Sequence, residues 1–141
     1  MYRQRNLCRA DDPVRPEKET YLFFDTETAG LPRYRNASPH DTRAWPRLVQ
    51  IAWLFCDSEG HAGRQACFTI RPEGFTIPPG AVSVHGITTD TAIRTGVSLK
   101  TALDALCREV ARCGTVVAHN AAFDSAVVAA ECARTGLANP L

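Results

Sequence analysis

The sequence lacks an excess of either charge. It has 16 Lys and Arg residues against 15 Asp and Glu residues, a formal net charge of +1. This balance excludes a polybasic histone-like protein and an acidic tail protein, so any surface that binds nucleic acid must be local. Long apolar runs are also missing: residues 51–56 form one of the longest, far short of the ~20 residues that span a bilayer. Because the first residues hold no apolar signal segment either, we expect no membrane association.

Paired cysteine motifs are absent as well, although the chain has six cysteines. None of them forms a CxxC pair, and no histidine pattern completes a zinc site. Several lie among apolar residues of predicted strands and helices, where a cysteine behaves as a small buried hydrophobe. We therefore expect reduced thiols throughout and a cytoplasmic location. The six are Cys8, Cys56, Cys67, Cys107, Cys113 and Cys132.

What the sequence does contain is enough apolar material for one domain. Of 141 residues, 45% are hydrophobic, which excludes a disordered chain and fits a single core. Residues 1–18 are polar and contain Pro13 and Pro16, so we expect a flexible polar tail there. That tail is either a solubilising leader or a basic arm that touches nucleic acid. Residues 19–141 form the expected folded domain.

Three apolar segments predict strands. Residues 20–25 (TYLFFD) are nearly all apolar, which predicts a strand covered on both faces. Residues 48–57 (LVQIAWLFCD) and 64–70 (RQACFTI) follow, with a turn at 58–60 between them. The three predict an antiparallel meander.

The second half of the domain predicts helices around a fourth strand. After a loop at 72–80, residues 81–85 suit a single helical turn. A helix capped by Ser98 carries one apolar stripe and stops near Gly114. Residues 115–118 form a short strand, and a last helix runs from a cap at Asn120 through Arg134. The predicted order is therefore β-β-β-α-β-α. The stripe consists of Leu99, Leu103, Leu106 and Val110.

Three acidic residues follow the ends of predicted strands. Asp25 and Glu27 are two positions apart, so on a strand their side chains point the same way. A hard divalent cation such as Mg²⁺ or Mn²⁺ would relieve the repulsion between the two carboxylates. The plainer alternative is a solvated strand end. Asp124 lies in the first turn of the last helix, where the helix dipole alone would also explain it.

The ordered set of motifs resembles the DnaQ-like 3′–5′ exonucleases of the DEDD superfamily. DTETAG at residues 25–30 matches the first motif of that family, and HNAAFD at 119–124 matches the second. The WPRLVQIA and HGIT stretches between them look like the family's linking segments. The resemblance implies a ribonuclease H-like fold, in which a mixed sheet of three antiparallel strands and one parallel strand carries flanking helices. The family includes ribonuclease T and the proofreading epsilon subunits of bacterial polymerases.

The resemblance also implies a role for each motif residue. Asp25 would bridge two divalent metal ions, Glu27 would help to hold the ion that activates water, and Asp124 would act on the second ion. His119 and Asn120 would shape and cap the turn rather than touch substrate. For Leu31 and Phe123 the alternative is core packing, and for His85 it is a hydrogen bond that stabilises a turn. The positions expected to contact the terminal nucleotide are Thr26, Thr28, Leu31, Val84, His85 and Phe123.

One family feature is missing from the 141 residues. The third motif, a helix with a fourth carboxylate and a histidine five residues or a tyrosine four residues before it, does not follow the second motif. We therefore expect residues 19–141 to be the N-terminal portion of an exonuclease domain, with its C-terminal part missing and little activity of its own. The alternative is a catalytically inactive module that binds nucleic acid or docks on a polymerase.

The segment 31–47 carries four arginines and one acid. With Tyr34 and Trp45 interleaved, it suits single-stranded nucleic acid, through phosphate contacts and base stacking. The alternative is a solvated loop with Trp45 in the core. The arginines are Arg33, Arg35, Arg43 and Arg47. We expect a nuclease acting at the 3′ end of DNA or RNA; the motifs decide neither between the two nor whether a DNA polymerase is a partner, and they leave the oligomeric state open.

Overall fold

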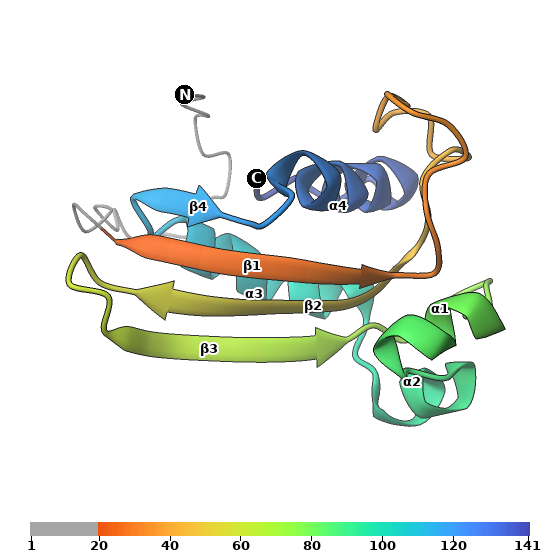
Figure 1. Ribbon diagram of the computed structural model, residues 1–141, viewed down its shortest axis with the longest axis horizontal. Helices are drawn as coiled ribbons and strands as arrows, with labels where there is room; N and C mark the ends of the chain where they lie inside the picture. The colour runs from red at the N-terminus through yellow and green to blue at the C-terminus, as the bar shows by residue number, and fades with distance from the viewer. Residues whose placement is uncertain (1–19) are drawn as a thin grey trace.

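The computed structural model describes residues 20–141, so the expected tail at 1–18 and Cys8 lie outside the described residues. Figure 1 shows a sheet with helices behind it and at one end. The elements in chain order are β1 (Tyr21–Thr28), β2 (Leu48–Cys56), β3 (Ala62–Thr69), α1 (Pro79–His85), α2 (Thr89–Thr95), α3 (Leu99–Val110), β4 (Thr115–Val117) and α4 (Ala121–Thr135).

The sheet has the predicted mixture of strand directions. Its order is β3-β2-β1-β4. β1 pairs with β2, and β2 with β3, in antiparallel fashion, whereas β4 runs parallel to β1. β1 is thus central, and β4 ends opposite Phe23, five residues before the end of β1.

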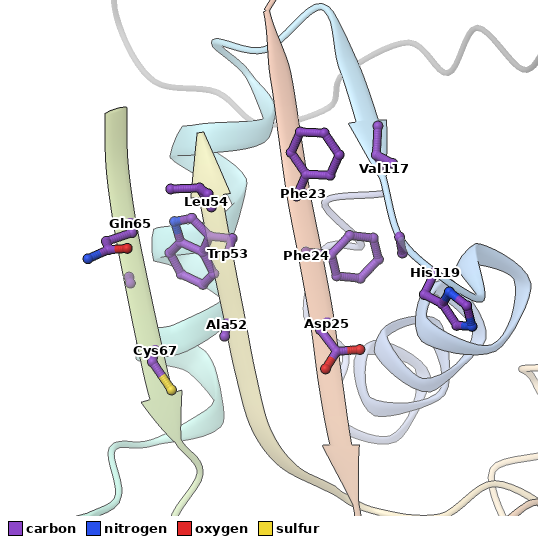
Figure 2. Close-up of a pocket in the computed structure, with 12 residues that line it drawn as sticks. Phe23, Phe24, Asp25, Ala52, Trp53, Leu54, Gln65, Cys67, Val117 and His119 are labelled. Atoms are coloured by element: carbon purple, nitrogen blue, oxygen red, sulfur yellow. The ribbon is translucent and has the colours of Figure 1, made fainter. Parts of the chain in front are cut away.

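Burial along β1 alternates, which corrects the expectation of a strand covered on both faces. Leu22 and Phe24 are buried, but Tyr21 and Phe23 remain 36% and 43% exposed. The reason is that α3 and α4 both pack on the same face of the sheet (Figures 1 and 2). Tyr21 and Phe23 point to the opposite face, which no described helix covers.

The main core lies between the sheet and the two long helices. Ser98 caps α3 as predicted, accepting a hydrogen bond from the Thr101 amide at 3.1 Å. The stripe residues Leu99, Leu103 and Leu106 are buried against the strands. α3 ends at Val110 rather than near Gly114, whose amide instead donates to the Thr20 carbonyl at 3.1 Å and leads the chain into β4.

The structure has one helix that the sequence pattern did not predict. α2 is built from threonine-rich sequence of low helix propensity. The Thr88 side chain caps it, accepting from the Thr91 amide at 3.1 Å. Its buried Ala92 packs with Val49 and Ile77 in a second small core that holds α1 and α2 at the end of the sheet. None of the described helices is long and apolar enough to cross a membrane.

The cysteines only partly follow the expectation of reduced thiols. Cys56, Cys113 and Cys132 are free and buried, and Cys67 is free and exposed. Cys107 is disulfide-bonded, so the expectation is wrong at that position. The thiol argument for a reducing compartment therefore does not extend to every cysteine.

Candidate active site

Two unpaired carboxylates lie near the end of β1. The strand continues through Thr28, so Asp25 and Glu27 lie within it, opposite Ala52 and Gln50 of β2. Asp25 is exposed and Glu27 half-buried. Within residues 20–141 neither carboxylate takes part in a side-chain hydrogen bond or ion pair. Two free carboxylates on one strand face form a plausible donor set for a hard cation.

Asp124 reaches β1 from the helix side of the sheet. It lies in the first turn of α4 and is only 3% exposed. The hydroxyl of Thr26, which points to that same face, donates to the Asp124 carboxylate at 2.6 Å. Because Thr26 stands between Asp25 and Glu27, this bond anchors the start of α4 next to the two free acids.

The three acids nevertheless do not share one coordination shell. Among the described residues, no group of three ligating side chains that includes Asp25, Glu27 or Asp124 has its ligand atoms within 4.8 Å of one another. Alternation along β1 explains this arrangement, since Asp25 and Glu27 point away from the face on which Thr26 meets Asp124. The structure therefore places the third acid at the same strand end but on the other side of the backbone.

A tighter cluster occurs in the β2–β3 turn, where Asp57, Glu59 and His61 do meet that distance. The Asp57 carboxylate accepts hydrogen bonds from the amides of Glu59 and His61, both at 2.9 Å. The backbone bond from His61 is the main reason that the pKa of Asp57 lies below its usual value, with smaller contributions from the His61 side chain and the Glu59 amide. These hydrogen bonds close the exposed turn, and this structural role accounts for the proximity of the three side chains.

His119 lies near Asp25, although the sequence predicted for it only a role in shaping the turn. In the parallel pair, Phe23 lies opposite Val117. β4 ends there, so His119 lies two residues beyond β4, while Asp25 lies two residues beyond Phe23 on β1. Figure 2 shows the exposed His119 just beyond β4, near Asp25. Asn120 occupies the predicted helix N-cap position, and its carbonyl accepts the Phe123 and Asp124 amides, but its side chain makes no cap hydrogen bond.

Asp25 also stands at one end of an open hollow on the uncovered sheet face. The hollow has a volume of about 1160 Å³. The strand register places Phe23 beside Leu54, and Asp25 beside Ala52, on this face. Figure 2 shows the largely apolar floor, with Asp25 and His119 toward one end. The lining includes Phe23, Asp25, Ala52, Leu54, Gln65, Cys67, Val117 and His119.

Of the predicted nucleotide-contacting residues, Thr26 and Thr28 lie on β1, Leu31 follows that strand and Val84 lies on α1. Leu31 is 82% and Val84 81% exposed, so core packing does not explain either. Thr28 donates its hydroxyl to the Gly30 carbonyl at 2.6 Å and shapes the turn that leaves the strand. Thr26, as described, is engaged with Asp124.

His85 and Phe123 both have structural partners. His85 Nδ1 accepts the Ile87 amide at 3.1 Å, which is the turn-stabilising bond foreseen as the alternative. Its Nε2 then carries the proton in the neutral ring, yet it is buried without a partner within residues 20–141. The Phe123 ring packs on Trp45, with centroids 5.9 Å apart.

The segment 31–47 is only partly free to meet a substrate. Trp45 is packed in, and its indole N–H donates to the carbonyls of Ala37 and Ser38 at 3.2 and 3.1 Å. Arg47 pairs with the buried Glu131, Nε to Oε1, at 2.8 Å. The interpretation of Trp45 as part of the core is thus confirmed, and Arg47 has a structural partner that the sequence did not reveal.

Comparison with known proteins supplies a family. The family model described as "Exonuclease" matches residues 22–140. Ribonuclease T of Haemophilus influenzae strain Rd is 31% identical over 125 residues, covering 82% of this chain and 52% of the relative; ribonuclease T of strain PittEE is 30% identical over the same length. The chain therefore spans about half the length of the curated relatives it matches.

Solved structures agree with the fold. A product-bound structure of exonuclease I superposes with a TM-score of 0.65 and 27% identity, covering 79% of this chain and 24% of that one. E. coli exonuclease I in complex with a dT13 oligonucleotide gives a TM-score of 0.63 at 27% identity, covering 78% of this chain and 22% of that one. The mixed sheet with its flanking helices is thus the ribonuclease H-like arrangement that the motifs implied.

Proposed function

Because the chain belongs to the exonuclease family of DEDD type, we propose that it carries the metal-binding half of a 3′–5′ exonuclease site. Its substrate would be the 3′ end of single-stranded DNA or RNA. The observation that carries this proposal is the pair of unpaired carboxylates, Asp25 and Glu27, on the part of β1 that continues past the end of β4.

The acidic residues on and beside this part of β1 suit divalent metal ions. Asp25 and Glu27 offer oxygen ligands on one face, and Asp124 stands across Thr26. Bound there, two Mg²⁺ or Mn²⁺ ions would supply an activated water and stabilise the leaving 3′ oxygen. In the proposal Asp25 would help to hold both ions, Glu27 the ion that activates water, and Asp124 the second ion.

The rest of the site would hold the terminal nucleotide. Leu31, three residues beyond the end of β1, and Val84, on α1, present exposed apolar side chains against which a base can pack. The orphan Nε2–H of His85 is a donor without a partner among the described residues, and it suits a nucleotide oxygen or nitrogen. His119, which Figure 2 shows just beyond β4 and near Asp25, would exchange a proton there.

A second candidate function is binding without hydrolysis. It is favoured by one observation: Asp124 bonds to Thr26 and does not share a ligand shell with Asp25 and Glu27. Such a module would hold a 3′ end or dock on a DNA polymerase. A cytoplasmic location belongs to either candidate; four cysteines of the described residues are free, whereas Cys107 is disulfide-bonded.

The test compares the chain with Asp25→Asn and with Asp90→Asn, a matched change at an exposed aspartate on α2. Titration calorimetry with Mn²⁺ should show heat that disappears only in Asp25→Asn. With 5′-labelled single-stranded DNA and RNA, shortening from the 3′ end should fall at least 100-fold in Asp25→Asn and stay unchanged in Asp90→Asn. Oligonucleotide binding without hydrolysis or metal heat would support the second candidate instead, and equal behaviour of both variants would overturn the metal assignment.

A further inference from the structure

A second, smaller hollow of about 250 Å³ adjoins the end of β1. It lies between the segment 31–47 and the stretch that leads to α1. Three arginines line it, together with apolar and backbone groups, and no acidic side chain does. The lining is Ala29, Gly30, Leu31, Arg33, Arg43, Ala44, Trp45, Pro46, Arg47, Phe75 and Thr76.

Backbone hydrogen bonds pin together the two stretches of segment 31–47 that carry these arginines. The Ala29 amide donates to the Arg47 carbonyl at 2.9 Å and closes the segment at its base. One step farther, the Arg33 amide donates to the Ala44 carbonyl at 2.9 Å. Arg33 and Arg43 therefore stand on facing stretches of one pinned loop rather than on independent mobile chains.

The charges of the three arginines are balanced very differently. Arg47 pairs with Glu131, and its guanidinium lies 4.4 Å from the centroid of the Phe75 ring. Arg33 and Arg43 are exposed, and neither side chain has an ion pair or hydrogen bond within the described residues. The one acid of the segment, Asp41, accepts the Tyr34 hydroxyl and does not line the hollow.

Two adjacent uncompensated cations favour an anionic ligand. We propose that Arg33 and Arg43 form a phosphate subsite for internal phosphodiesters of the single strand whose 3′ end the proposed exonuclease site holds, an inference that rests on that proposed function. Gly30, on the wall of the hollow, is five residues beyond Asp25, at most ~16 Å at 3.3 Å per strand residue. A strand leaving the acids along this wall reaches the arginines within a few nucleotides, and their phosphate contacts are independent of base identity.

The test measures binding of a 5′-fluorescein-labelled oligothymidylate in EDTA, so that hydrolysis does not enter. Arg33→Gln/Arg43→Gln is compared with Arg108→Gln/Arg112→Gln, which removes the same charge from the α3 end of the molecule. Each phosphate contact to a single strand contributes ~0.7 to the slope of log K against log salt. We expect the loop variant to lose about 1.4 of that slope and to bind roughly tenfold more weakly at low salt, with the control unchanged.

Further arms define what the arginines recognise. Arg33→Lys/Arg43→Lys keeps the charge and should keep most of the slope, and thermal melting should show all variants folded. Competition by thymidine 5′-monophosphate that removes the arginine dependence would assign a terminal phosphate, and equal competition by polyglutamate would assign an acidic peptide; either would overturn the proposal. Equal slopes in wild type and loop variant overturn the subsite alone, whereas equal Mn²⁺ heats in wild type and Asp25→Asn overturn the metal assignment alone.

Discussion

At the residue scale, the buried carboxylate of Glu131 binds one of the four arginines of segment 31–47. It is 1% exposed, and its Oε1 accepts from Arg47 Nε and from the Leu48 amide, both at 2.8 Å. Arg134 lies 3.1 Å from the same oxygen and donates to the carbonyls of Thr42 and Trp45. Segment 31–47 is thereby tied to α4, and the charge of Arg47 is balanced by Glu131.

Replacing this carboxylate should weaken the fold measurably. Glu131→Gln leaves Arg47 and Arg134 without a counter-charge, at a cost of about 1.5–3 kcal/mol, the usual value for hydrogen bonds to a charged group. Urea unfolding gives the free energy of unfolding directly. Glu73→Gln, at an exposed residue, should stay within about 0.5 kcal/mol of wild type. A Glu131→Gln protein as stable as this control would show that the network adds nothing.

Cysteine reactivity is a second prediction at this scale. Burial, reinforced by the neighbouring Glu131 charge, raises the pKa of Cys132 to about 11. At pH 8 its thiol stays protonated and therefore unreactive, whereas the exposed Cys67 is accessible. Iodoacetamide labelling followed by peptide mass spectrometry should find Cys67 modified well before Cys132. Labelling in the opposite order would contradict the described packing of α4.

At the element scale, β1 combines a buried face and an open one within a single run of apolar residues. Leu22 and Phe24 face the helices, while Tyr21 and Phe23 are exposed on the opposite face, where Phe23 and Asp25 line the hollow. The strand is therefore anchored by one face, and its other face is free to present the carboxylates.

Neighbouring substitutions on β1 should differ sharply in effect. Leu22→Ala removes a fully buried side chain and should cost about 2–5 kcal/mol. Phe23→Ala removes a larger side chain that is 43% exposed and leaves no internal cavity, so its cost should be clearly smaller than that of Leu22→Ala. Chemical denaturation of the two variants settles the comparison. Equal losses of stability would show that a cover lies over Phe23 in solution.

At the scale of the whole molecule, the helices are distributed unevenly. α3 and α4 cover one face of the sheet, and α1 and α2 stand at its end (Figure 1). The opposite face exposes Tyr21 and Phe23, with Leu54 and Val117 beside them in the hollow. Exposed apolar faces and sheet edges promote association between copies.

We therefore expect the 141-residue chain to self-associate as its concentration rises. Phe23→Thr keeps a residue of high strand propensity and removes the central apolar ring of the face, so it should reduce association. Static light scattering across a concentration series measures the effect. Val84→Thr is the control, since Val84 is 81% exposed on α1, away from the sheet face. Association that persists in Phe23→Thr, or that falls equally in the control, would exclude this face as its cause.

Much of this protein could be predicted from local sequence. The three meander strands, the Ser98-capped helix and the Gly136 stop of α4 follow from periodicity and capping chemistry, which act between residues close in the chain. α2 escaped prediction because its sequence has little helix propensity, and a small core around Ala92 holds it in place. The two acidic motifs, with their order along the chain, were enough to indicate the exonuclease family.

The sequence by itself thus determined the strands, the long helices, the family and the two acids that share a strand face. Only the tertiary structure decided which face of β1 stays open. It also decided that Thr26 donates a hydrogen bond to the Asp124 carboxylate, and that Glu131 pairs with Arg47, 84 positions away in the chain. Side-chain periodicity is a local property of the backbone, so the residues alone reveal it. Partners far apart in the chain are chosen by how helices pack on the sheet, and no local pattern encodes that choice.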